Sequence, residues 1–542
     1  MSKSDVSKEE SHTGDSSSYN QGHESGPNFT STRPAATVQT LKPFTTLSAI
    51  GIGYGVTNTA MGLLLVVGTV MPLGGSPLFF WGFIAMAAVG LATATTLAEL
   101  VSAMPHPGGQ YIWVHRLAPS STRRFLSYIT AMLSYFSAVA TGASASLSFA
   151  TGVCATISLL DARFETQRWM VFLAYQLLNV TTLVLASFEQ LLPSISKASL
   201  FLSCLTLAAI IVTLFAMSDR EGAAGSTILI SSNGDIETNI SGWPNGVAFI
   251  MGMNGANWCF SCLDVATHLA EEIPSPAHNI PRALLWTVVI GFLSGLALVV
   301  TLLVNLEGPI DPAADNTALA LFYRITTSRP DFNSPAAAVG LWIPVLLTVV
   351  AAVWSIQTWQ SRLAWTISRE GGFPFHERLS KIAPAPFHTP VGALVMSALL
   401  HAILGCLYLG SDLAFNALIS SGIMLQYLSY SIPVVLLLIN RSWHDGASME
   451  KRGRAGLTHG PFWYPCLGLV ANCVMLCWTF VAVVFYCFPT YLTLQSQAQM
   501  NYASVVMVAV VCLSIGLWFG YARNHYEVKD EPDHRVGRME TA

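Results

Sequence analysis

Residues 51–62 read GIGYGVTNTAMG, and residues 252–264 read GMNGANWCFSCLD. In both stretches, glycine and polar residues stand in the middle of a long apolar segment. Glycine costs a helix about 1 kcal/mol relative to alanine, so neither stretch favours a continuous helix. We therefore expect two apolar helices that are interrupted near their centres.

The composition of the whole chain indicates what surrounds these helices. Only 10% of the 542 residues are charged and 52% are hydrophobic, whereas an average soluble domain has roughly 25% charged residues. This excludes an ordinary soluble enzyme and a disordered scaffold. The 26 basic residues nearly balance the 30 acidic ones, so no positive excess points to nucleic acid as a partner. We expect the lipid bilayer as the partner instead.

Stretches without charge predict the number of crossings. A crossing needs about 20 apolar residues, and backbone groups in lipid must bond one another, as they do in a helix. Stretches free of Asp, Glu, Lys and Arg predict an all-α integral membrane protein with twelve transmembrane helices. The expected helices cover about residues 46–70, 77–103, 125–153, 169–188, 195–217, 246–270, 283–306, 337–361, 388–410, 413–440, 462–487 and 500–522.

The positive charges predict the orientation of the chain. With the amino terminus in the cytoplasm, 21 of the 26 Lys and Arg residues fall on the cytoplasmic side, as the positive-inside rule requires. We expect both termini to be cytoplasmic, with a disordered tail over residues 1–42 and a second tail over 523–542. Asn239 begins a glycosylation sequon in a loop expected outside. Such matches are common by chance, so both a used and an unused sequon stay open.

The two interrupted helices lie five helices apart, each at the start of a five-helix set. This spacing is typical of transporters with inverted repeats, in which the first helix of each repeat is unwound where substrate binds. The amino end of a half-helix carries about +0.5 charge and holds a carboxylate well. The sequence thus predicts a transporter domain over residues 43–522. In the alternative, the glycines only allow close helix packing.

Other polar residues near the expected spans are candidates for the site. Asp264 follows the second interruption and either faces a cavity or lies at the membrane interface. Near the inner helix ends, the candidates for an inner gate are Glu99, Glu271, Arg362 and Arg369, and solvated loop charges are the alternative. The candidates for cavity lining are Tyr135, Trp354 and Gln357.

No motif in the chain points to catalysis, a metal or a cofactor. Cys259 and Cys262 have CxxC spacing, but they lie in an apolar helix without a second Cys or His pair nearby, which favours small packing residues. The sequence contains no GxSxG, HExxH or P-loop motif. We therefore expect no enzyme activity.

Motifs outside the interruptions resemble those of one family. They are AELVSAMP at residues 98–105, GGQYIWV at 108–114, THLAEE at 267–272 and SREGGFP at 368–374. With these motifs in this order, nearly all of residues 41–526 resembles the fungal amino-acid/choline/GABA permeases of the amino acid–polyamine–organocation superfamily. The resemblance implies a five-plus-five inverted repeat with two extra helices, and alternating access with substrate bound between broken helices 1 and 6.

The resemblance also places the substrate-binding residues. The first break would comprise Asn58, Thr59, Ala60, Met61 and Gly62, and the second Phe260, Ser261, Cys262, Leu263 and Asp264. The family usually has glycine and an aromatic residue where this chain has Cys262 and Leu263. Leucine cannot make a cation–π contact, which favours an amino acid or GABA over choline.

The function implied is a secondary-active importer of a small nitrogen compound such as an amino acid or GABA, at the plasma membrane and coupled to protons. Some members of the superfamily use a lysine midway along helix 5 for proton coupling. Here the lysine of that region is Lys197, at the start of the helix, so the proton acceptor is unknown. A choline or polyamine transporter and a non-transporting nutrient sensor on the same fold remain as alternatives.

Overall fold

The computed structural model describes residues 46–161, 163–217, 239–305, 316–327, 334–384, 386–410, 414–442, 459–493 and 500–528. All regular elements within these ranges are helices. The tail predicted over residues 1–42 and most of the tail predicted over 523–542 lie outside the described residues. The predicted division into tails and a membrane domain therefore stays a prediction.

The helices form two sets of five crossings. The first set consists of α1 (Thr46–Thr57) with α2 (Thr59–Pro77), η1 (Leu78–Gly82) with α3 (Phe83–Ala103), α5 (Arg123–Leu160), α6 (Arg168–Ala186) and α7 (Leu192–Met217). The second consists of α8 (Asn245–Cys259) with η3 (Leu263–Leu269), α9 (Pro276–Val304), α11 (Pro335–Arg369), α13 (Val391–Gly405) and α15 (Ala414–Ser442).

Two further crossings and several short helices complete the described part of the chain. The last crossings are α16 (Pro465–Phe485) and α17 (Ala503–Leu517), and the latter continues through η7 (Trp518–Ala522) and α18 (Arg523–His525). The short connecting helices are α4 (Gln110–Leu117), η2 (Glu189–Leu191), α10 (Thr317–Thr327), α12 (His376–Leu379) and α14 (Leu407–Gly410).

Eleven of the twelve crossings in the described residues arise from ten long apolar segments, because one segment crosses twice. The first segment, Ala49–Ala103, has 55 residues, or about 80 Å of helix, against about 30 Å of hydrocarbon. It reverses at Gly75, whose φ of 59° and ψ of −151° suit glycine alone. The broken pair α8 and η3 adds the twelfth crossing of the described residues. The predicted all-α, twelve-helix membrane fold is confirmed.

The broken helices pack closely because small residues line their contact. A Cβ atom on Gly255 of α8 would lie 2.5 Å from Val70 Cγ2 of α2, and a Cβ on Gly62 would lie 3.1 Å from Cys259 Sγ. Since larger side chains do not fit there, α2 and α8 approach backbone to backbone, as helices in lipid often do.

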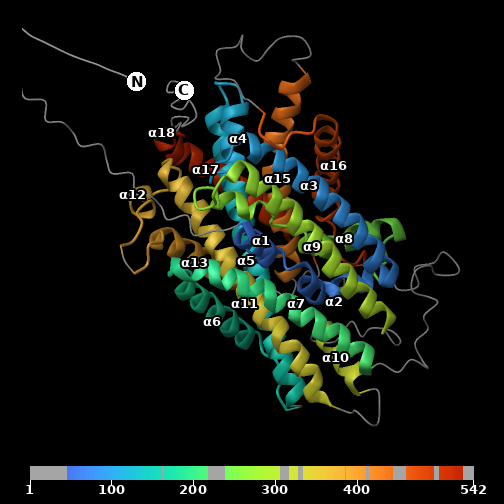
Figure 1. Cartoon of the computed structure of the whole chain (residues 1–542). Helices are drawn as coiled ribbons and strands as arrows, with labels where there is room; N and C mark the ends of the chain where they lie inside the picture. The colour runs from blue at the N-terminus through green and yellow to red at the C-terminus, as the bar shows by residue number, and fades with distance from the viewer. Residues whose placement is uncertain are drawn as a thin grey trace, which may run out of the picture. The chain divides into compact units, whose positions relative to one another are not determined.

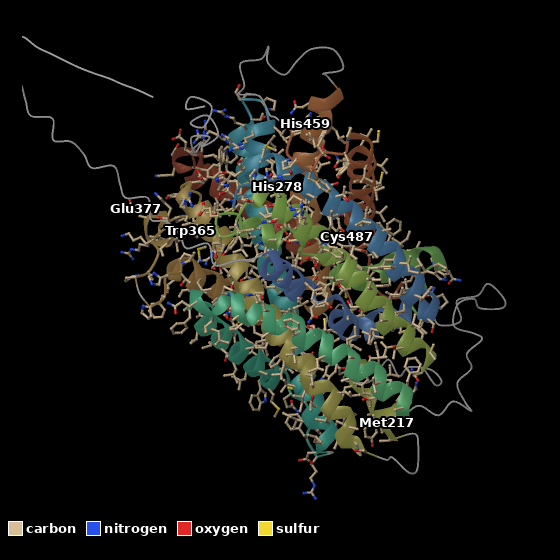
Figure 2. All side chains as sticks on the ribbon, viewed as in Figure 1. Met217, His278, Trp365, Glu377, His459 and Cys487 are labelled. Carbon is tan, nitrogen blue, oxygen red and sulfur yellow. The ribbon has the colours of Figure 1, made fainter. Side chains whose placement is uncertain are left out.

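The bundle has two ends that serve as reference points below. Figure 1 shows α4 and α10 at opposite ends of the helices, and we name them the α4 end and the α10 end. His459 lies toward the α4 end, and Met217, the last residue of α7, lies at the α10 end (Figure 2).

Candidate functional site

Both interruptions contain a residue in the left-handed conformation. Asn58, between α1 and α2, has φ 34° and ψ 51°, and Cys262, between α8 and η3, has φ 62° and ψ 30°. Residues other than glycine rarely adopt this conformation, and they cluster at functional sites when they do. Each of the two glycine-rich and polar stretches of the sequence therefore contains one strained backbone position, and the two positions lie in facing helices.

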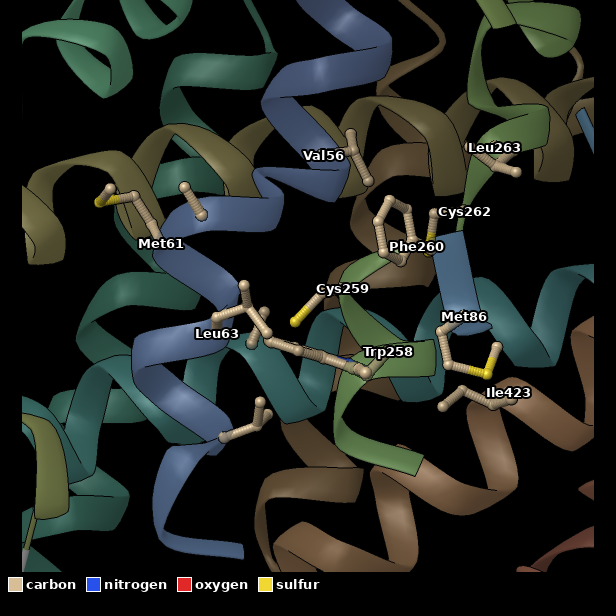
Figure 3. Close-up of a cluster of buried hydrophobic side chains, with 14 of the residues drawn as sticks. Val56, Met61, Leu63, Met86, Trp258, Cys259, Phe260, Cys262, Leu263 and Ile423 are labelled. Carbon is tan, nitrogen blue, oxygen red and sulfur yellow. The ribbon is translucent and has the colours of Figure 1, made fainter. Parts of the chain in front are cut away.

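The two breaks touch one another. Thr59 Oγ1, at the start of α2, donates a hydrogen bond of 3.0 Å to the carbonyl of Cys259, at the end of α8. Val56 of α1 and Phe260 and Cys262 of the second break belong to one cluster of buried side chains in this region (Figure 3). Because the first turn of a helix leaves N–H groups without intrahelical acceptors, the start of α2 presents donors and positive potential here.

A small cavity lies between the breaks, and we call it the break cavity. Its volume is about 30 Å³, close to that of one or two waters. It is lined by Val56, Thr57, Asn58, Met61, Gly62, Leu65, Thr141, Ala145, Trp258, Ser261, Cys262, Val349, Ala352 and Ile356. Three residues with a hydroxyl, one with an amide, one with an indole and one with a thiol stand among otherwise apolar lining residues, and no carboxylate is among these described residues. At this volume the structure is closed around the site.

A larger cavity lies about one helical turn away, toward the α10 end, and we call it the vestibule cavity. Its volume is about 180 Å³. It is lined by Gly68, Thr69, Pro72, Leu73, Met251, Gly252, Asn254, Gly255, Ile419, Ser420, Phe485, Tyr486, Phe488, Thr490, Tyr491 and Asn501. The helices α2 and α8 line both cavities, so movement of either helix alters both.

The ten predicted break residues divide into two groups. Asn58, Met61, Gly62, Ser261 and Cys262 line the break cavity. The remaining five, Thr59, Ala60, Phe260, Leu263 and Asp264, are buried beside it. Phe260, for example, packs its ring 5.3 Å from that of Phe83.

Asp264 lies in a buried polar cluster beside the break cavity. Its Oδ1 accepts hydrogen bonds from Tyr430 (2.5 Å) and Gln426 (3.2 Å). Its Oδ2 accepts one from Gln110 (2.7 Å) and lies 3.0 Å from His268 Nε2. The carboxylate therefore faces the protein interior and not the membrane interface.

The candidates for cavity lining occupy other places in this structure. Tyr135 shares a hydrogen bond of 3.0 Å with Ser397. Gln357 donates to Asn179 Oδ1 at 2.6 Å, and Trp354 lines a separate small pocket. The face of α11 that lines the break cavity is apolar: Val349, Ala352 and Ile356. Sequence reasoning missed this face, although its i, i+3, i+7 spacing marks one side of a helix.

Two ion pairs join the gate candidates of α11 to the chain after η3. Arg362 Nε lies 2.8 Å from Glu272 Oε1, and both side chains are largely buried. Arg369 Nη1 lies 3.0 Å from Glu271 Oε1 and is about one-third exposed. Glu99 is buried where α3 meets α16, since a Cβ on Gly468 would touch its carboxylate. These pairs hold η3 and α11 together at the α4 end.

His106, in the connection before α4, is held neutral. Burial, together with the positive charges of Arg116 and Arg369 and the nearby His268, lowers the pKa of His106 to about 3. Its Nδ1 accepts the N–H of Gly108 at 2.9 Å. His106 therefore acts as a fixed hydrogen-bond acceptor at neutral pH.

Asn239 lies at the α10 end. Its amide nitrogen donates to the carbonyl of Trp243 at 2.8 Å, and its Oδ1 accepts from the hydroxyl of Ser241, the third residue of the sequon, at 2.6 Å. Glycosylation of Asn239 stays a prediction.

Twelve crossings, with the first of each five-helix set broken at a shared cavity, define a multi-span helical membrane transporter. The chain matches the family model described as amino acid permease over residues 44–511, and it belongs to this family. It is a transporter and not an enzyme.

Known relatives agree with this assignment. The chain is 57% identical to the swainsonine transporter swnT of Arthroderma benhamiae over 491 residues, 91% of this chain and 93% of that protein. It is 33% identical to the choline transporter of Saccharomyces cerevisiae, over 91% of this chain and 84% of that protein. Among solved structures, a manganese transporter of Eremococcus coleocola has the same fold, with a TM-score of 0.51 and 14% identity over 90% of this chain and 95% of that one.

Proposed function

We propose that this chain is a secondary-active permease that takes up a small hydroxylated or zwitterionic amine by alternating access through the break cavity. The observation that carries the proposal is the Oδ1 atom of Asn58, which is buried with no hydrogen-bond partner among the described residues and belongs to the cavity wall. An unsatisfied buried acceptor is costly, and a substrate N–H group would satisfy it.

The chemistry of the cavity wall favours some substrates over others. The hydroxyls of Thr57, Thr141 and Ser261 suit a substrate with hydroxyl or carboxylate groups, whereas a polyamine would require carboxylates, which are absent from the described lining residues. Trp258 is the one aromatic residue among these described lining residues, and a choline site commonly surrounds its cation with several aromatic rings.

Swainsonine is the first candidate substrate, because the chain shares 57% identity with a protein named for its transport and because swainsonine is a small hydroxylated amine. An amino acid or GABA is the second candidate, since the amino end of α2 offers N–H donors to a carboxylate. Choline and polyamines rank below these two candidates as substrates.

The proposal includes direction and energy source. We place the α4 end in the cytoplasm, because that end carries most Lys and Arg residues of the described part of the chain. The cytoplasmic placement of both termini is kept from the sequence. The vestibule cavity then faces outward and the break cavity is closed toward the cytoplasm, where the Arg362–Glu272 and Arg369–Glu271 pairs form the inner gate. Proton coupling at the plasma membrane completes the proposal.

The test is uptake by purified protein in liposomes. Labelled swainsonine, GABA, neutral and basic amino acids, choline and putrescine would be offered with the outside at pH 5.5 and the inside at pH 7.5. Asn58→Ala would remove the unsatisfied acceptor and raise KM by about 10- to 100-fold, the value of one hydrogen bond to a charged group. Asn472→Ala is the matched control, because Asn472 is also buried without a hydrogen-bond partner among the described residues but lies outside both cavities.

The outcomes separate the alternatives. Uptake of swainsonine or GABA with a raised KM for Asn58→Ala alone supports the proposal. Uptake of choline alone would show that the proposed substrate class is wrong. Transport of none of these compounds by folded protein would leave the nutrient sensor as the better hypothesis.

A further inference from the structure

His268 has an acceptor in front of each ring nitrogen. Its Nδ1 lies 2.7 Å from the carbonyl oxygen of Pro107, and its Nε2 lies 3.0 Å from Asp264 Oδ2. A backbone carbonyl only accepts, so Nδ1 carries a hydrogen. The contact between Nε2 and Oδ2 then needs a second proton, on the imidazole or on the carboxyl group.

We propose that Asp264 and His268 form the proton-binding site that couples transport to the proton gradient, with one exchangeable proton held between His268 Nε2 and Asp264 Oδ2. This inference rests on the proposed transport function. With the proton bound, the pair is neutral overall, whether as imidazolium and carboxylate or as imidazole and carboxylic acid. Without it, the pair carries one negative charge.

Because the pair is buried, gain or loss of this proton changes its electrostatic energy strongly. The side chains of Asp264 and His268 are at most 1% exposed, and an uncompensated charge is costly at such depth. Arg362 and Arg369 pair with Glu272 and Glu271 instead. Loss of the proton also turns the Nε2 lone pair toward the carboxylate, so the closed arrangement loses its central hydrogen bond.

Gln426 connects this site to the break cavity. Its Nε2 donates to Asp264 Oδ1 at 3.2 Å, and its Oε1 accepts the N–H of Cys262 at 3.1 Å. Cys262 is the left-handed residue of the second break and lines the cavity. Movement of Asp264 on proton release therefore shifts the side chain that fixes the backbone at the break.

Other titratable groups around the site have separate roles. Tyr430 of α15 donates its hydroxyl to Asp264, and His106, before α4, is neutral because its pKa is near 3. On α1, Tyr54 bonds to Ser294. The remaining groups on the packed elements are Glu99 on α3, Tyr111, His115 and Arg116 on α4, His278 and Arg282 on α9, and Tyr427 on α15. The hydrogen bonds of Asp264 and His268 described above go to other groups: Gln110, Gln426, Tyr430, the carbonyl of Pro107 and one another.

In the transport cycle, the proton enters from the side with lower pH and binds between Nε2 and Oδ2 as the break cavity closes. It leaves to water on the other side when the closed arrangement opens. One proton is taken up and one released per cycle, and no other group changes its charge.

The test compares proton-driven accumulation with exchange. In liposomes with an inward gradient of one pH unit, one-proton symport allows about tenfold accumulation of an uncharged or zwitterionic substrate, since one pH unit equals a factor of ten. We expect His268→Gln and Asp264→Asn to lower this ratio to one and to abolish substrate-driven acidification. Counterflow exchange at equal pH should persist in His268→Gln. His401→Gln is the matched control, because His401 is also fully buried but lies on α13 outside the cluster.

The outcomes distinguish this inference from the proposed function. If the wild type transports substrate without moving protons, or if His268→Gln still accumulates substrate tenfold, the inference is overturned while the transport function stands. Loss of counterflow together with accumulation overturns it as well, because the pair would then serve binding or folding.

A second measurement needs no substrate. The histidine ¹⁵N NMR spectrum of wild type minus that of His268→Gln isolates the His268 signals from those of the other 12 of the 13 histidines. We expect Nδ1 to stay protonated and the Nε2 shift to change with pH as the shared proton leaves, and Asp264→Asn to remove that change. A His268 signal that is constant at every pH at which the wild type stays folded overturns the inference, even if no transported compound is found.

Discussion

Replacement of Gly62 by leucine tests whether the break cavity is the transport site. Gly62 belongs to the first turns of α2 and lines the cavity. A Cβ atom at this position would lie 3.1 Å from Cys259 Sγ and 3.6 Å from Trp258 Cζ3. Any larger side chain must therefore enter the cavity or push α2 and α8 apart.

The magnitude follows from the volumes. Leucine adds four carbon atoms, each about as large as a water molecule, whereas the break cavity has room for only one or two waters. The break cavity offers about 30 Å³. Overpacking of this kind costs about 1–3 kcal/mol, and a bias of that size against the closed state changes its population about 5- to 150-fold.

We expect the initial uptake rate of Gly62→Leu in liposomes to be about 5- to 150-fold lower than that of the wild type. The yield of folded protein should be unchanged. Gly340→Leu is the matched control, because Gly340 also lies in a transmembrane helix, and a Cβ atom at this position would have no other atom within 4 Å. A Gly62→Leu variant with the wild-type rate and KM would refute the placement of the site.

Three further predictions concern stability and pH. Arg362→Gln leaves the buried Glu272 without its cation and should lower the free energy of unfolding by about 3–5 kcal/mol. Arg369→Gln should lower it by at most about 1 kcal/mol, because the Arg369–Glu271 pair is about one-third exposed; equal losses of thermal midpoint in detergent would contradict this. His106→Gln should leave the pH profile of uptake between pH 5 and 7.5 unchanged, because a pKa of about 3 keeps His106 neutral throughout; a shifted profile would show that His106 titrates. Tyr135→Phe should lower the thermal midpoint by the equivalent of about 1 kcal/mol, the value of its bond to Ser397, at unchanged KM; a raised KM would place Tyr135 in the substrate path.

Much of the fold follows from local properties of the sequence. Apolar length and the rarity of charge are enough to predict twelve crossings, because lipid offers no partner to an exposed backbone. Likewise, glycine and polar residues in an apolar helix predict a weak point wherever they occur, and both weak points contain a left-handed residue, Asn58 and Cys262.

The direction in which each side chain points does not follow from local properties of the sequence. The polarity of Gln357 pointed to the cavity, yet its amide bonds to Asn179, 178 residues earlier in the chain. The face of α11 at the cavity is instead apolar. Polarity says that a side chain needs a partner, and a partner on a neighbouring helix satisfies that need as well as a cavity does.

By itself, then, the sequence determined the membrane fold, the repeat and the two positions where helices break, since each depends on composition or on residues next to one another. Only the tertiary structure decided what surrounds Asp264. Its partners Gln110, Gln426 and Tyr430 come from positions 154 to 166 residues away along the chain. Hydrogen bonds require approach within about 3 Å, and such approach between distant segments depends on how the helices pack.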